Sequence, residues 1–498
     1  MKNIKITKEH ITLAIIFILV LATRLFLVLP EKGFDYEAYD ALRQAGHIKE
    51  MGVPLFKDPL SYSGRVFVFP PLFYYVLAGF GFLMPLELAA KLVPNIAFAM
   101  LVIVVYFIAK HLTKNKTAAL IAAFFSGFVP IIFYSLSQIS VYSLSLPLIF
   151  FLSYTFLRIE EKGFATTSII LIILLLLTHT SVFIMLISFI IYFIILKLEK
   201  QELSKKEVEI ALFLFFLTMW FNLLLYKKAF FLHGIRFIWQ NIPLPLLSSY
   251  FEDISFLGVI SAVGVLSLLL GVYAIYHVFF KTKSQAATLY ISFAFISFIM
   301  LWFKLLPLKI GLLFLSINLI ILSAYSIKTI LVTISKTKTP WLSKVVVLLI
   351  VALFILTSIA PFIMTAKSET AKNPPLADIR ALEWIKNNTR EKAVVLGRVE
   401  EGFLITYVAK RKNVADQNFL MINNIDQRYR DIKLLFTLRL KSEAVRLFND
   451  YRIDYILLST QSMKEYNLTK LFYADQDCFD LVYRNQAIVY KFLRCDVE

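Results

Sequence analysis

The sequence predicts a polytopic α-helical membrane protein of about 11 spans that ends in a small α/β soluble domain. The 498 residues are 59% hydrophobic, whereas soluble domains are closer to half apolar. The apolar residues gather in uncharged runs, many of them long enough to cross a hydrocarbon core, which takes about 20 helical residues. Beyond residue 365 these runs stop. We therefore expect a transmembrane domain at 1–365 and a soluble domain at 366–498.

The first apolar run is predicted to be a membrane helix and not a removable signal peptide, because it lacks a small-residue cleavage site and further spans follow. The stretch that begins at Pro70-Pro71 is apolar but short and interrupted by Gly. It is predicted to be a helix lying at the membrane interface. The spans are predicted at 11–30, 88–109, 117–132, 141–157, 164–178, 181–196, 209–226, 254–280, 286–303, 309–327 and 345–365.

The net charge of +18 belongs mainly to the membrane part of the chain. Residues 1–365 hold 30 Lys and Arg against 16 Asp and Glu, and residues 366–498 hold 22 against 18. Short cytoplasmic loops collect Lys and Arg, and the basic connectors all fall on one side of the predicted spans. An odd number of spans then makes the C-terminal domain extracytoplasmic in a multi-pass cell-membrane protein. Because membrane orientation explains the charge, no nucleic-acid partner is expected.

The first outer loop, predicted at 31–87, begins with a segment of helical character that Gly52 stops. Asp35 and Glu37 place two carboxylates directly after the first span. Carboxylates at the mouth of a membrane cavity can deprotonate an acceptor or hold a divalent cation. The alternative is that they only stabilise the N-terminus of the helix through its dipole.

The C-terminal domain holds both cysteines of the chain, Cys478 and Cys495. The stretch between them alternates like a hairpin, which would bring its two ends together. A disulfide is one prediction, and two buried thiols are the other. The other elements predicted in this domain are a helix at 377–388 and strands at 393–396 and 455–459.

The first outer loop resembles that of the oligosaccharyltransferase catalytic subunits. It reads FDYEAYDALRQAGHIKEMGVPLFKDPLSYSG and then FPPLFYYVLA, and the family has an Asp after the first helix, an Asp-Pro-Leu stretch and a Tyr-Pro-Pro. Weaker matches in KHLTKNKTAALIAAFFSGFVP, SSYFEDIS and ALEWIKNNTREKAVVLGRVEEGF extend the resemblance over nearly the whole chain. It implies the GT-C fold of membrane glycosyltransferases. In that fold Asp35 matches the catalytic aspartate, and Glu37 matches the second acid of the O-mannosyltransferase type.

The second outer loop departs from the family pattern. The family carries a metal-binding Asp-x-Asp pair there, where this chain reads SQISVY from Ser137 to Tyr142. A divalent cation, Mg²⁺ or Mn²⁺, would then have Asp35, Glu37 and Glu252 as its carboxylate ligands, although such ions prefer several charged oxygen ligands.

The C-terminal domain holds the second departure. The family's Trp-Trp-Asp-Tyr-Gly motif, which recognises the Ser or Thr of the acceptor sequon, reads Arg-Val-Glu-Glu-Gly from Arg398 to Gly402. Arg and Val do not replace the aromatic walls of that pocket. Transfer to Asn-x-Ser/Thr sequons is therefore not expected.

Three cations on the predicted outer side fit a phosphate-bearing donor. Lys304 and Lys309 flank a short loop, Lys309 lying near where the family keeps a phosphate-binding Arg, and Arg236 lies in the 227–253 loop. Each can pair with a lipid phosphate, or only snorkel to the interface. His179, in a turn between two spans, is a candidate contact for donor or acceptor, with a purely structural role as the alternative.

The sequence therefore predicts a membrane glycosyltransferase that takes a sugar from a polyprenyl-phosphate or polyprenyl-diphosphate donor. The acceptor is a glycan, lipid or protein on the outer face, and Asp35 acts as the base of an inverting displacement. Two alternatives stay open: a divergent oligosaccharyltransferase for protein N-glycosylation, and a non-catalytic protein of the same fold.

Overall fold

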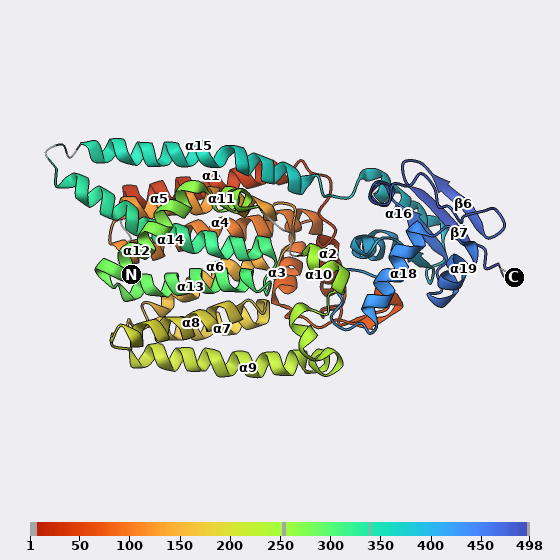
Figure 1. The fold of residues 1–498 in the computed structure, drawn as a ribbon, viewed down its shortest axis with the longest axis horizontal. Coiled ribbons are helices and arrows are strands. Elements are labelled where there is room, and N and C mark those ends of the chain that lie inside the picture. The colour runs from red at the N-terminus through yellow and green to blue at the C-terminus, as the bar shows by residue number, and fades with distance from the viewer. Residues whose placement is uncertain (1–6, 251–254, 338, 340, 496–498) are drawn as a thin grey trace.

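The apolar runs of the sequence form helices that pack side by side, and the C-terminal residues form an α/β unit at one end of them (Figure 1). This computed structural model describes residues 7–250, 255–337, 339 and 341–495. Large apolar side chains remain exposed along the bundle, as expected for helices that face lipid. The chain is a multi-pass membrane protein. The bundle helices are α1 (Lys8–Val28), α4 (Leu86–Thr113), α5 (Lys116–Phe128), α6 (Tyr142–Phe156), α7 (Phe164–Thr178), α8 (Val182–Leu198), α9 (Lys205–His233), α11 (Phe256–Val263), α12 (Val265–His277), α13 (Gln285–Trp302), α14 (Leu308–Ser335) and α15 (Leu342–Thr370).

Seven helices of the described residues are long and apolar enough to cross a membrane. The helices α5 to α8 are apolar as predicted, but each has only 10–17 residues. A span perpendicular to the bilayer needs about 20 residues. The number of eleven spans therefore stays a prediction, whereas the helical class of the membrane part is confirmed.

The predicted span at 254–280 is interrupted in the structure. Gly264 has a φ of +83°, which L side chains rarely adopt, and α11 ends there before α12 begins. The first residue of the predicted span lies outside the described part of the chain. Because uncharged residues continue on both sides of Gly264, hydropathy does not reveal the break.

The first outer loop, between α1 and α4, forms two helices and a hairpin. The helix α2 (Ala38–Met51) ends at Gly52, whose φ of +78° confirms the predicted stop. The strand β1 (Lys57–Asp58) pairs with β2 (Arg65–Val66), and α3 (Leu72–Gly81) follows and packs against α2. The position of α3 at the membrane interface stays a prediction.

A buried arginine fixes the start of the second outer loop. Arg24 of α1 donates from Nε to Asn95 Oδ1 at 2.9 Å, from Nη1 to the Ile132 carbonyl at 2.9 Å and from Nη2 to Ser135 Oγ at 3.1 Å. Its planar group thereby joins α1, α4 and the 3₁₀ turn η2 (Pro130–Ser135). The residues that follow η2 are held close to the first outer loop.

The C-terminal unit is built on a five-stranded mixed sheet of order β4-β3-β5-β7-β6. The strand β3 is parallel to β4 and β5, whereas β7 is antiparallel to β5 and β6. The predicted helix, the two predicted strands and the hairpin are confirmed. The elements are α16 (Leu376–Asn388), β3 (Val394–Leu396), α17 (Gly402–Leu404), β4 (Lys412–Asn413), α18 (Ile425–Thr437), α19 (Lys441–Asp450), β5 (Tyr455–Leu458), α20 (Thr460–Glu465), β6 (Phe479–Arg484) and β7 (Ile488–Phe492); α10 (Leu244–Tyr250) precedes α11.

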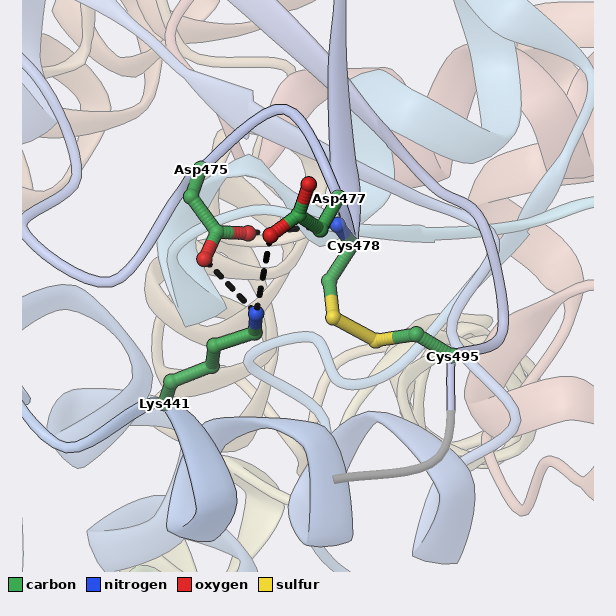
Figure 2. Close-up of a disulfide and its surroundings, with 5 residues drawn as sticks. All are labelled: Lys441, Asp475, Asp477, Cys478 and Cys495. Carbon is green, nitrogen blue, oxygen red and sulfur yellow. Dashed lines mark hydrogen bonds and ion pairs between the residues drawn. A yellow bond between two sulfur atoms is a disulfide. The ribbon is translucent and has the colours of Figure 1, made fainter. Parts of the chain in front are cut away.

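A disulfide joins Cys478, just before β6, to Cys495, beyond the end of β7 (Figure 2). The two Cα atoms are 5.3 Å apart, and the predicted bond is confirmed. Beside it, Lys441 Nζ lies 2.7 Å from Asp475 Oδ2, and Asp475 accepts a hydrogen bond from the Cys478 backbone N–H (Figure 2). The disulfide thus joins the two strands of the hairpin at the end opposite its turn.

Buried polar contacts fix the first outer loop to the C-terminal unit. Arg65 Nη2 lies 2.8 Å from Asp416 Oδ1, and both side chains are buried. The Tyr62 backbone N–H donates to Asn413 Oδ1 at 2.6 Å, and Ser61 donates to Asp416. Such additional hydrogen bonds are what a buried ion pair needs. The C-terminal unit is therefore held against the loop that carries the two predicted acids.

Candidate functional site

Asp35 lies between α1 and α2, where its carboxylate caps the start of α2. Its Oδ1 accepts a hydrogen bond from the Ala38 backbone N–H at 2.9 Å, and its own N–H donates to the Ser137 carbonyl at 3.4 Å. Burial, together with the charge of Glu37, raises the pKa of Asp35 from 3.8 to about 8. A carboxyl group with this pKa exchanges a proton readily near neutral pH.

Glu37 is exposed to water, although protein surrounds it closely enough to alter its ionisation. Desolvation raises the pKa of Glu37, and the charge of Lys309 opposes this effect. Among the described residues, none forms an ion pair with the Glu37 carboxylate. This carboxylate is therefore available to a ligand.

The second outer loop contributes the amide of Gln138, and the preceding turn η2 contributes the phenol of Tyr134. The side chain of Gln138 lies near Asp35 and partly counters the burial that raises the pKa of Asp35. Burial and the charge of Glu37 raise the pKa of Tyr134 well above 10, so its hydroxyl stays protonated and can donate. The loop thus surrounds the acids with neutral hydrogen-bonding groups.

Lys309 is the predicted cation that the structure brings to the acids. It lies in the first turn of α14, and its charge acts on Glu37. Its Nζ lies 3.0 Å from Glu369 Oε1 at the end of α15 and 4.3 Å from the centroid of the Tyr134 ring. A positive charge therefore borders the acid pair from α14.

His179, in the turn between α7 and α8, packs against Tyr142 at the start of α6. The two ring centroids are 4.6 Å apart. His179 Nδ1 accepts the Ser181 backbone N–H at 3.0 Å, which assigns the ring proton to Nε2. Burial lowers the pKa of His179 to about 4. At neutral pH the ring is an uncharged hydrogen-bond donor.

The other predicted cations are placed differently. Lys304 is exposed in the turn between α13 and α14 and forms no ion pair with another described residue. Arg236 Nη1 lies 2.9 Å from Asp426 Oδ2 of α18, so it ties the loop after α9 to the C-terminal unit. Among the described residues, no contact links Lys304 or Arg236 to Asp35 or Glu37. Phosphate binding by these two cations stays a prediction.

The donor groups near the acids do not fit a tightly held divalent cation. Asp35 and Glu37 supply two carboxylates, and a lysine ammonium acts on one of them. Mg²⁺ takes about six oxygen ligands in strict geometry. In the parts of the chain that are described, no three His, Cys, Asp or Glu side chains form a group suited to a metal. Glu252, the third predicted ligand, lies outside the described residues.

No protein-family model matches this sequence, and neither does any curated protein. Solved structures do match. The Archaeoglobus fulgidus oligosaccharyltransferase in complex with Zn and sulfate is 16% identical, with a TM-score of 0.64 over 89% of this chain and 67% of that chain. The same organism's oligosaccharyltransferase AglB with an inhibitory peptide and a dolichol-phosphate is 16% identical, with a TM-score of 0.68 over 91% and 70%. ArnT from Cupriavidus metallidurans bound to undecaprenyl phosphate is 12% identical, with a TM-score of 0.60 over 96% and 97%.

The chain has the GT-C fold. The predicted fold class is confirmed, and at these identities the likeness concerns the fold alone. The chain is as long as ArnT but shorter than the archaeal oligosaccharyltransferase.

Arg398 of the C-terminal unit borders the acid pair. The Arg398 guanidinium carbon lies 6.0 Å from the centroid of the Tyr36 ring, and Tyr36 stands between Asp35 and Glu37 in the chain. Arg398 Nε binds Glu401 Oε1 at 3.0 Å. The segment from Arg398 to Gly402 thus brings an arginine, paired with a carboxylate, close to the acid pair.

Sequence reasoning missed Glu369, Tyr134 and Gln138. Glu369 stands at the end of the last apolar run, where a charged residue is ordinary, and only the packing of α15 on α14 brings it to Lys309. Tyr134 and Gln138 lie in or next to the second outer loop. They are the two large polar side chains of a connector whose other polar residues are serines, and that was the available signal.

Proposed function

We propose that this GT-C protein is a membrane glycosyltransferase that transfers a sugar from a polyprenyl-phosphate or polyprenyl-diphosphate donor to an acceptor on the extracytoplasmic face. The observation that carries the proposal is the placement of Asp35 and Glu37 beside Lys309, with Arg398 of the C-terminal unit 6.0 Å from the ring of the intervening Tyr36. The neighbours of the same fold support a lipid donor, since AglB was solved with a dolichol-phosphate and ArnT with undecaprenyl phosphate.

The chemistry proposed for the site is a single displacement. A nucleophilic oxygen or nitrogen of the acceptor forms a bond to the anomeric carbon, while the bond from that carbon to the phosphate oxygen of the carrier breaks. Asp35 accepts the proton that the acceptor loses, and the carrier leaves as an anion. The ammonium of Lys309 stabilises that anion. One displacement inverts the configuration at the anomeric carbon.

A glycan or lipid acceptor is favoured over a protein sequon. Arg398 and its carboxylate partners stand where the oligosaccharyltransferase family uses aromatic walls. Charged side chains hydrogen-bond to sugar hydroxyls or head groups, whereas an apolar wall suits the methyl group of Thr. A divergent N-glycosylation enzyme and a non-catalytic protein remain the alternatives, and each predicts a different outcome below.

The direct test is the Asp35→Asn substitution in the full chain. We expect sugar transfer to fall by roughly 10²–10⁴-fold, the usual contribution of a positioned base. Transfer is measured by mass spectrometry of envelope glycans and glycolipids, and of sequon peptides, from cells with wild-type protein, the variant or no protein. Asp40→Asn, a neighbouring buried carboxyl group that does not belong to the acid pair, is the matched control.

The outcomes distinguish the candidate functions. Loss of one sugar residue from a glycan or glycolipid supports the proposal, and loss of glycans from sequon peptides supports the oligosaccharyltransferase. Unchanged glycans in the deletion strain would contradict the proposed function. Full activity of a folded Asp35→Asn protein would contradict the assignment of Asp35 as the base.

A further inference from the structure

One buried carboxylate, Glu369, holds two lysines beside the acid pair. Glu369 lies in the last turn of α15 and is 7% exposed. Its Oε1 accepts from Lys309 Nζ at 3.0 Å and from Lys372 Nζ at 3.1 Å. A single carboxylate charge offsets only one of the two ammonium groups that bind it.

Lys309 and Glu369 of this cluster lie close enough to the acid pair to act on it electrostatically. The Lys309 ammonium stands over the Tyr134 ring, and its charge acts on Glu37. The charge of Glu369 contributes to raising the pKa of Asp35, after burial and Glu37. Lys309 and Glu369 therefore border the acid pair, and Lys372 is joined to them through Glu369.

Lysine alone is a poor element of a preformed site. Its four-carbon side chain has many rotamers, and fixing them costs conformational entropy at the moment of binding. A carboxylate that is itself buried removes this cost beforehand, because it orients the ammonium groups in the absence of the ligand. Lysine and arginine at the membrane boundary are also suited to lipid phosphate groups.

We infer that Glu369 is a positioning residue that holds Lys309 and Lys372 in place as a binding site for the phosphate of the polyprenyl carrier. The inference rests on the proposed function, since it assigns the leaving-group side of that site. Glu369 does not touch the reacting atoms and acts through the two lysines. The alternative is a strut that only joins the end of α15 to α14.

The test measures binding of undecaprenyl phosphate to the full-length protein in nanodiscs, with undecaprenol as the phosphate-free probe. Glu369→Gln keeps the shape of the side chain and removes its charge, whereas Glu369→Asp keeps the charge. We expect Glu369→Gln to raise the Kd for undecaprenyl phosphate by about tenfold or more, because the two lysines must then be ordered when the phosphate binds and this cost exceeds the repulsion that loss of the carboxylate removes. Undecaprenol binding should stay the same, and Glu369→Asp should recover most of the loss.

The chain offers a matched control at the opposite end of the bundle. Glu9, in the first turn of α1, is also buried and also binds two lysines, Lys110 and Lys116. Glu9→Gln should lower the thermal stability as much as Glu369→Gln does, and leave the Kd for undecaprenyl phosphate unchanged. Inorganic phosphate at millimolar concentration should not displace the lipid if the site is built for the carrier.

Two failures are separable. If the wild-type protein binds undecaprenyl phosphate and Glu369→Gln binds it equally well, Glu369 is only a strut and the proposed function survives. If the wild-type protein binds undecaprenyl phosphate and undecaprenol equally well, and Glu369→Gln changes neither Kd, both the inference and the proposed donor are wrong. A Kd raised alike by Glu369→Gln and Glu9→Gln would also overturn the inference.

Discussion

At the scale of single residues, the two carboxyl groups of the first outer loop have different environments. Asp35 is tied to the backbone of α2, and Glu37 is free of ion pairs with the described residues. The charge of Glu37 opposes ionisation of Asp35, whereas the charge of Lys309 favours ionisation of Glu37. Environments that separate the ionisation of two acids are typical of sites where one carries a proton and the other stays charged.

The pKa of Asp35 predicts the pH dependence of transfer. A general base is active when deprotonated, so kcat/KM should rise with pH and level off above about 8. Glu37→Gln removes a neighbouring negative charge and should move the rising limb to lower pH, even though its maximum activity falls. The measurement is a pH–rate profile of purified enzyme, with Asp40→Asn as a control whose limb should not move. A pH–rate profile whose rise is centred near the ordinary pKa of a carboxyl group would exclude Asp35 as the base.

At the scale of elements, Gly402 at the start of α17 has a packing role. A β-carbon on Gly402 would lie 2.1 Å from the Ala415 carbonyl oxygen and 2.5 Å from Asp416 Cβ. Asp416 is the partner of Arg65 in the first outer loop. Backbone atoms cannot move aside as the end of a side chain can. The glycine therefore allows the start of α17 to approach the segment that docks the C-terminal unit.

Gly402→Ala should consequently loosen this docking. We expect a loss of roughly 1–3 kcal/mol, the usual cost of overpacking, and lower transfer at high temperature. Thermal unfolding of the full chain in detergent checks the stability. Gly79→Ala, in α3, is the control, because an added β-carbon there meets nothing within 4 Å. Equal melting temperatures for Gly402→Ala and wild type would contradict the close approach.

Hydropathy and alternation predicted most elements because both depend on local sequence. The helix at α16 and the β6–β7 hairpin follow from periodicity, and the disulfide follows from the hairpin. The break at Gly264 was missed because a helix interrupted by one glycine has the same mean hydropathy as a continuous helix. Local patterns therefore identify elements more reliably than their interruptions.

At the scale of the whole molecule, contacts between distant segments decide the site, and these have no local signal. Arg236 was predicted to bind phosphate, but it pairs with Asp426, 190 positions further along the chain. Lys309 finds Glu369 only because α14 and α15 pack together. Asp35 was found because the acid pair follows the first span directly. The cations were harder to assign, since a basic residue at a helix end serves snorkelling, pairing or binding alike.

The orientation of the whole molecule gives the last prediction. The Lys and Arg of the short connectors predict that the C-terminal unit lies outside the cytoplasm, and a disulfide persists there because the compartment is oxidising. Trypsin added to right-side-out vesicles should cut the C-terminal unit and spare the basic connector at 328–344, and inverted vesicles should give the reverse.

Trapping thiols in intact cells before denaturation gives an independent readout. Because the chain has only two cysteines, the wild-type protein should take up no label without reduction, and Cys478→Ser should label once. Free thiols in the wild type, together with protection of the C-terminal unit from trypsin, would put the acid pair on the cytoplasmic face. The acceptor would then have to be sought in the cytoplasm, so orientation decides which acceptors the enzyme can meet.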